Sequence, residues 1–126
     1  MMPWMAVAAG GALGAVLRHG VNQLMLQVAG ANFPWGTLTV NVAGSLVMGF
    51  LIGAFAHLWD ASQTLRLFLT VGILGGFTTF SAFSLDSVLL LQKGQIFEAI
   101  SYILCSVLLS LGGLALGMML IRMVSA

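Results

Sequence analysis

The sequence predicts an all-α membrane protein that forms one domain of four transmembrane helices over residues 1–126. Hydrophobic residues make up 60% of the chain, and Asp, Glu, Lys and Arg together make up only 6%. A soluble domain normally has about a quarter of its residues charged, because these residues cover its surface in water. The few charges also stand far apart, and the apolar stretches between them approach the roughly 20 residues of a membrane-crossing helix. We therefore expect the chain to lie in the lipid bilayer.

The four spans follow from the apolar runs and the polar breaks between them. We place the spans at about residues 4–28, 37–56, 65–91 and 96–123. Pro34 lies in the first break, where it ends one helix and precedes the next. Each of the three tryptophans falls at a span end, where the indole ring prefers the membrane interface. These tryptophans are Trp4, Trp35 and Trp59.

Glycines recur four residues apart in the first two spans, as Gly10 with Gly14 and Gly49 with Gly53. Small residues at this spacing let the backbones of two membrane helices approach closely. We therefore expect both spans to pack tightly against neighbouring helices.

Lys and Arg are nearly balanced across the predicted topology. Arg66 and Arg122 fall on the side of the two termini, whereas Lys93 falls on the other side with Arg18 within reach of it. An excess of Lys and Arg on one side normally fixes orientation, so a chain without a clear excess can insert both ways. Four short helices alone can hardly enclose a polar path. These two points predict an antiparallel homodimer of dual topology.

Polar side chains inside the spans are candidate functional residues, because an unpaired polar group in lipid costs several kcal/mol. Tyr102, Ser106 and Ser110 recur every four residues on the fourth span. One serine alone would be expected to donate to the carbonyl four residues earlier, but three hydroxyls on one face favour a polar track. Asn41 on the second span leaves two interpretations open, since its amide either joins two helices or faces a wet path.

The third span contains the strongest anomaly, residues 72–84 with the sequence GILGGFTTFSAFS. Two adjacent glycines followed by hydroxyl residues predict a helix broken in the middle of the membrane. Broken backbone at that depth needs protein or a water-filled cavity as its partner. Its freed carbonyls are ready cation ligands and its freed amides are anion donors. Phe80 and Phe83 border this break.

Other classes of function find no support. A net charge of +1 excludes nucleic acid as a partner, because phosphate binding needs a basic patch. The sequence contains no nucleophile–base set, nucleotide-binding loop or Cys/His cluster, so we do not expect an enzyme. The intramembrane Arg18 favours anions over cations.

Three motifs resemble the CrcB/Fluc family of fluoride channels, and the resemblance covers nearly the whole chain. The motifs are GGALGAVLR at residues 10–18, GTLTVNVAGS at residues 36–45 and GILGGFTTFSAFS at residues 72–84. The third motif is the most specific. Family members often have Ser or Thr where this chain has Ala82.

The resemblance implies a passive channel that lets fluoride leave a bacterial cell through its inner membrane, with two pores in an antiparallel homodimer. The implied fluoride path consists of Asn41, Phe80, Phe83, Tyr102, Ser106 and Ser110, with Ser81 and Arg18 as further candidates. The positive ring edges of the phenylalanines could replace part of the anion's hydration shell. The implied cofactor is a structural sodium ion at the dimer centre, held by the backbone carbonyls of Gly75 and Thr78.

A proton-coupled small multidrug exporter is the alternative, because that family also has four spans, a similar length and dual topology. Such an exporter needs a carboxylate buried in its first helix. The only charged residue in the first span here is Arg18, so we prefer the channel.

Overall fold

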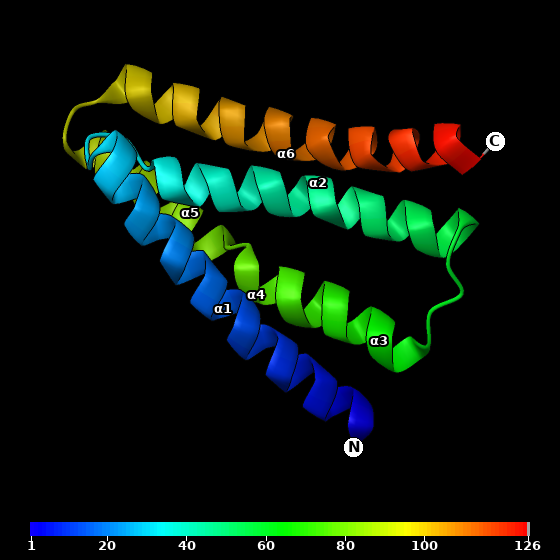
Figure 1. Ribbon diagram of the computed structural model, residues 1–126. Coiled ribbons are helices and arrows are strands. Elements are labelled where there is room, and N and C mark those ends of the chain that lie inside the picture. Colours follow the sequence, from blue (N-terminus) through cyan, green and yellow to red (C-terminus); the bar gives the residue numbers. More distant parts are fainter. Residues whose placement is uncertain (126) are drawn as a thin grey trace.

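The computed structural model describes residues 1–125, and this part of the chain is helical with no strands (Figure 1). This confirms the prediction of an all-helical protein. The elements in chain order are α1 (Met2–Ala29), α2 (Trp35–His57), α3 (Gln63–Leu67), the π-helical segment η1 (Phe68–Leu74), α4 (Gly75–Phe77), α5 (Phe80–Gln92) and α6 (Ile96–Ser125).

Three helical stretches within residues 1–125 are long and apolar enough to cross a membrane. They are Trp35–His57, Gln63–Gln92 and Ile96–Ser125, and they include the second, third and fourth predicted spans. The helix α1 has 28 residues but is not among the three. Its polar side chains, Arg18 and Asn22 among them, lower its hydropathy.

The helices α2 and α6 lie side by side and run in the same direction (Figure 1). A Cβ atom added at Gly49 would collide with the carbonyl oxygen of Leu114, and one added at Gly53 would lie 2.9 Å from the side chain of Ile121. Only glycine permits backbones this close. The predicted close packing at Gly49 and Gly53 is therefore confirmed.

The helix α1 crosses the third helical stretch and packs on η1 and α4. A Cβ atom at Gly10 would lie 2.6 Å from the carbonyl oxygen of Phe68, and one at Gly14 would collide with the carbonyl of Ile73. This contact confirms the expected close packing of the first glycine pair. It holds α1 against the backbone just before the functional site.

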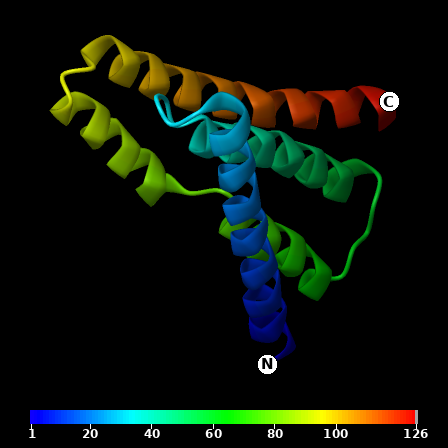
Figure 2. The same ribbon diagram turned by 60° about the vertical axis from the view of Figure 1, so that its left-hand side comes forward.

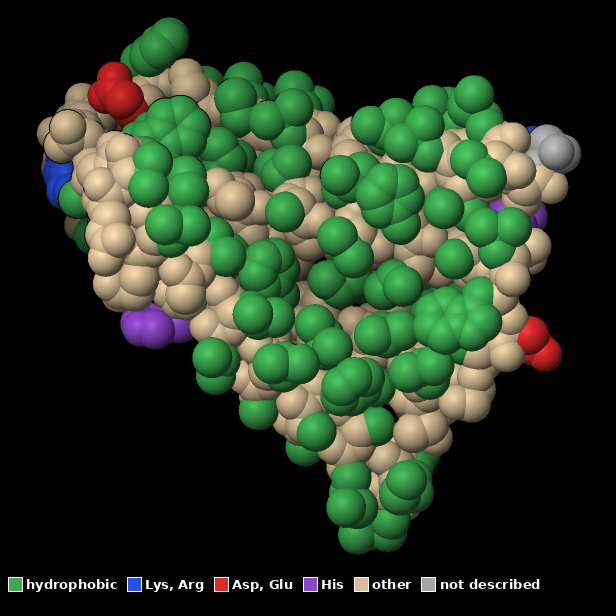
Figure 3. Space-filling view, viewed as in Figure 1, with side chains coloured by type: hydrophobic (Ala, Val, Ile, Leu, Met, Phe, Trp, Pro, Cys, Tyr) green, Lys and Arg blue, Asp and Glu red, His purple; other side chains and the backbone are tan. Residues whose placement is uncertain are grey.

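The surface is apolar over most of its area, as expected for a multi-pass membrane protein. On the face in Figure 3, hydrophobic side chains cover the middle of the molecule, and charged side chains gather at its two ends. Large apolar side chains such as Trp4 (82% exposed) and Phe97 (79% exposed) lie outside the core. Lipid rather than water is the medium in which such a surface is stable.

Candidate functional site

The third helical stretch is interrupted between α4 and α5 (Figure 2). Thr78 (φ −87°, ψ 158°) and Thr79 (φ −152°, ψ 118°) are extended. Gly75 is helical, with φ −61° and ψ −38°, so the glycines themselves do not leave the helix. The helix ends at the two threonines that follow, because β-branched side chains favour extended backbone.

The interruption removes the helical hydrogen bonds that would span Thr78 and Thr79, and two of the freed amides donate to side chains instead. In a continuous α-helix, the amide of Thr79 would donate to the carbonyl of Gly75, and the amide of Ala82 to that of Thr78. Here the Thr79 amide donates to Oδ1 of Asn41 at 2.7 Å. The Ala82 amide donates to Oγ1 of Thr79 at 3.2 Å. The carbonyls of Gly75 and Thr78 have therefore lost their usual donors.

Asn41 joins α2 to the start of α5. Its Nδ2 donates to the carbonyl of Thr79 at 3.0 Å, while its Oδ1 accepts from the amide of the same residue. One side chain thus replaces both backbone partners of Thr79. Of the two interpretations left open by the sequence, the structure shows the first, because the amide joins two helices; Asn41 also lines a cavity.

Arg18 lies beside the same interruption but does not line the cavity. Its Nε donates to the carbonyl oxygen of Gly76 at 3.0 Å. Gly76 is one of the last residues of α4, where carbonyls lack helical donors and a positive charge is favourable. Arg18 therefore caps the C-terminal end of α4.

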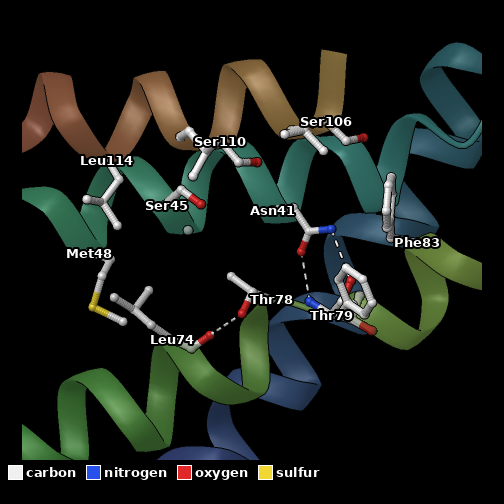
Figure 4. A pocket seen from close by; sticks show the side chains of 14 residues that line it. Asn41, Ser45, Met48, Leu74, Thr78, Thr79, Phe83, Ser106, Ser110 and Leu114 are labelled. Atoms are coloured by element: carbon white, nitrogen blue, oxygen red, sulfur yellow. Dashed lines mark hydrogen bonds between the residues drawn. The ribbon is translucent and has the colours of Figure 1, made fainter. Parts of the chain in front are cut away.

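A cavity of about 400 Å³ lies between α2, the interrupted stretch and α6 (Figure 4). Five of the predicted path residues line it, namely Asn41, Phe80, Phe83, Ser106 and Ser110. They come from three helices that are distant in sequence. The other predicted path residues, Tyr102, Ser81 and Arg18, do not line this cavity.

The hydroxyls of Ser106 and Ser110 are buried and have no hydrogen-bond partner within residues 1–125. Other helical serines behave differently. The hydroxyls of Ser84 and Ser87 donate to the carbonyls four residues earlier, at 3.0 and 2.8 Å. An unpaired buried hydroxyl is destabilising, and these two hydroxyls remain available to a hydrogen-bond partner.

Aromatic rings form one end of the cavity. The ring centroids of Phe80 and Phe83 are 5.6 Å apart, and those of Phe83 and Tyr102 are 5.4 Å apart. Tyr102 is fully buried and its hydroxyl donates to Oδ2 of Asp86 at 3.1 Å. Phe80 is 78% exposed in the single chain, so nothing within residues 1–125 covers this side of the site.

A second cavity, of about 380 Å³, lies beside the loop between α1 and α2. Its polar lining residues include Asn22, Thr37, Asp86 and Lys93. Asp86 connects it to the first cavity's aromatic end, because its carboxylate accepts from Tyr102.

The comparison with known proteins identifies the family. Residues 5–118 match the model of the family described as "CrcB-like protein, Camphor Resistance (CrcB)". The chain belongs to the CrcB family.

Curated CrcB relatives are similar over almost their whole length. A protein of Rhodospirillum centenum, "Fluoride-specific ion channel FluC", is 53% identical over 118 residues, which cover 94% of each chain. One of Rhizobium meliloti with the same name is 53% identical over 116 residues, covering 92% of this chain and 93% of the relative. "Fluoride-specific ion channel FluC 1" of Nitrobacter hamburgensis is 48% identical over 124 residues, covering 96% and 98%. These relatives are named as ion channels, not as enzymes.

Nine cavity residues of this CrcB chain were not predicted as path residues, and those with a hydroxyl are Ser45, Thr78 and Thr79. Ser45 follows Asn41 by one helical turn, so its spacing alone placed it on the same face. Thr79 lies in the third motif, but nothing in the sequence indicates that it pairs with Asn41.

Proposed function

We propose that this chain is a passive, fluoride-selective channel through which fluoride leaves the bacterial cell across the inner membrane. The observation that carries the proposal is the pair of buried, unpaired hydroxyls, Ser106 and Ser110, that line the same cavity as Asn41 and the two phenylalanines. The printed names of relatives 48–53% identical to this chain support fluoride as the anion.

The chemistry of the cavity suits a small, strongly hydrated anion. Hydroxyls donate hydrogen bonds to it, and phenylalanine edges present the positive part of their quadrupole. The path therefore runs past Phe80 and Phe83, along Asn41, and down the hydroxyls of Ser106 and Ser110, while Tyr102, predicted as part of the path, packs behind the ring of Phe83 and donates to Asp86. These weak, successive donors replace hydration without holding the ion too tightly to leave.

The working unit in this proposal is an antiparallel homodimer with two pores. In it α1 is the fourth transmembrane helix, and the third is broken in the middle of the membrane. The exposed ring of Phe80 supports a second copy, because the path is open on that side in one chain. The near balance of Lys and Arg lets the two copies insert in opposite orientations.

A structural sodium ion at the dimer centre fits the interruption between α4 and α5. The carbonyls of Gly75 and Thr78 have lost their helical donors to Asn41 and Thr79, and unwound carbonyls are suitable sodium ligands. Two carbonyls lie between them in sequence, and that of Gly76 already accepts from Arg18. Gly75 and Thr78 would therefore hold the ion, which would supply positive charge that fixes the two broken helices.

The proton-coupled exporter is not favoured, since the only charged side chain in α1 is Arg18. Fluoride efflux from liposomes tests the channel directly. Liposomes loaded with potassium fluoride receive a potassium ionophore to balance charge, and a fluoride electrode records release at equal internal and external pH. A channel releases fluoride at once and retains chloride in matched chloride liposomes. Release that occurs only with an imposed proton gradient, or not at all, would refute it.

A further inference from the structure

The cavity has a third free hydroxyl on α2, the helix that lies beside the one with Ser106 and Ser110 (Figure 4). Ser45 projects from α2 into the cavity, one turn beyond Asn41 (Figure 4). The structure gives the Ser45 hydroxyl no hydrogen-bond partner within residues 1–125. Ser84 and Ser87, by contrast, bond to their own helix.

The packing of α2 on α6 determines how far along the two helices Ser45 lies from Ser110. A Cβ atom at Gly113 would lie 3.6 Å from the carbonyl of Val42, and one at Gly117 would lie 2.6 Å from the carbonyl of Leu46. Because the helices run in the same direction, Ser45 lies about one turn beyond the level of Ser110. Figure 4 shows Ser45 between Ser110 and Leu114.

The hydroxyl series on α6 ends at this level. The residue one turn after Ser110 is Leu114, which offers no donor. The neighbouring lining residue on α2 is Met48, which is also apolar. An anion that leaves Ser110 in this direction therefore meets the hydroxyl of Ser45 on the other helix, because the hydroxyl of Thr78 already donates to the carbonyl of Leu74.

We propose that Ser45 is a further anion-contacting residue of the path, to which Ser110 passes the anion as the donor series crosses from α6 to α2. This inference rests on the proposed channel function. The ligand is a small anion that accepts hydrogen bonds, and fluoride is the probe. A serine that served only to bring two helices together would need small size but no hydroxyl.

Three variants separate these two roles in the liposome efflux assay at equal density of assembled protein. Ser45→Ala keeps the small size and removes the donor, whereas Ser45→Thr keeps the hydroxyl. Ser101→Ala is the matched control, because Ser101 lies on α6 and lines neither cavity. We expect Ser45→Ala to slow fluoride efflux roughly two- to tenfold, the effect of one lost hydrogen bond. Ser45→Thr should restore most of the rate, and Ser101→Ala should match the wild type.

The proposal is overturned if the wild type releases fluoride and Ser45→Ala releases it equally fast. It is also overturned if Ser45→Thr is as slow as Ser45→Ala, because the hydroxyl would then be irrelevant. In both cases the channel function stands. A wild type that releases no fluoride overturns the channel function and this inference together.

Discussion

The polar side chains at the site fall into two groups, those with hydrogen-bond partners and those without, and the two groups have different roles. Asn41 is fully paired, since both ends of its amide bind the backbone of Thr79. Ser106 and Ser110 are equally enclosed but unpaired. A paired group fixes geometry, whereas an unpaired one is available to a ligand. The site therefore combines a rigid frame with free donors.

Replacing Asn41 with alanine tests whether its two hydrogen bonds to the backbone of Thr79 stabilise the protein. Asn41→Ala leaves the buried amide and carbonyl of Thr79 without partners, and each such loss costs about 1–3 kcal/mol. We expect thermal unfolding of the purified protein in detergent to shift down by several degrees. Asn32→Ala, in the exposed loop after α1, should leave it unchanged. Equal melting temperatures for Asn41→Ala and the wild type would contradict the assigned role.

The sequence predicted which polar residues share one cavity better than it predicted their hydrogen-bond partners. Periodicity placed Ser106 and Ser110 on one face, and the motifs added Phe80 and Phe83. The partner of Asn41 lies 38 positions away, and no local pattern encodes that pairing. Polar residues in lipid must find partners, but only the packed helices determine which ones.

At the scale of helices, apolar runs and turn residues predicted the segments well, because hydropathy and proline act locally. The π-helical segment Phe68–Leu74 was not predicted, since such segments are rare and have no sequence signature. The motif at residues 72–84 contains both the end of α4 at Phe77 and the start of α5 at Phe80. The motif did not show that the helix continues through Gly75 and ends at Phe77.

Close packing of α1 on the third stretch is tested by paired glycine variants. A Cβ atom at Gly14 would collide with the carbonyl of Ile73, whereas one at Gly20 meets nothing within 4 Å. We expect Gly14→Ala to lower the melting temperature, because the added Cβ atom would meet helix backbone, and displacing backbone costs more free energy than displacing a flexible side chain. Gly20→Ala should be neutral or stabilising by up to about 1 kcal/mol, as alanine favours helix. Equal thermal stability of the two variants would refute this account of the contact.

The proposed cation site at the interruption predicts a dependence on sodium. The carbonyls of Gly75 and Thr78 need a cation to replace their lost donors. Exchanging sodium for a large organic cation on both sides of the liposome should lower fluoride efflux and weaken the dimer in detergent. Returning sodium should restore both. Unchanged efflux and unchanged dimer stability after thorough exchange would exclude the sodium site.

For the whole molecule, the balance of basic residues predicts two orientations. The chain has four Lys and Arg residues in all, and neither predicted side has a clear excess. Two reporters, one active only inside the cell and one active only outside it, are fused to the C-terminus in turn. Both fusions should therefore show activity. Adding several lysines to the C-terminus should bias the chain to one orientation. If the unmodified chain shows activity with only one of the two reporters, the proposed antiparallel dimer is wrong.

The central claim is that fluoride passes through the cavity between the phenylalanines and the buried serines. Phe80→Ile and Phe83→Ile keep bulk and hydrophobicity but remove the ring edge. Phe97→Ile is the matched control, because Phe97 is exposed on α6 and does not line the cavity. Ser110→Ala should be milder than either, since neighbouring hydroxyls remain.

Fluoride efflux from liposomes, with every variant reconstituted at the same density of assembled dimers, is the most direct measurement. The lost edge contacts are each worth about 0.5–1.5 kcal/mol, so we expect efflux to fall by up to about tenfold in Phe80→Ile and Phe83→Ile. Phe97→Ile should keep the wild-type rate. Wild-type efflux in both cavity variants would show that these rings only pack the protein and that fluoride crosses elsewhere.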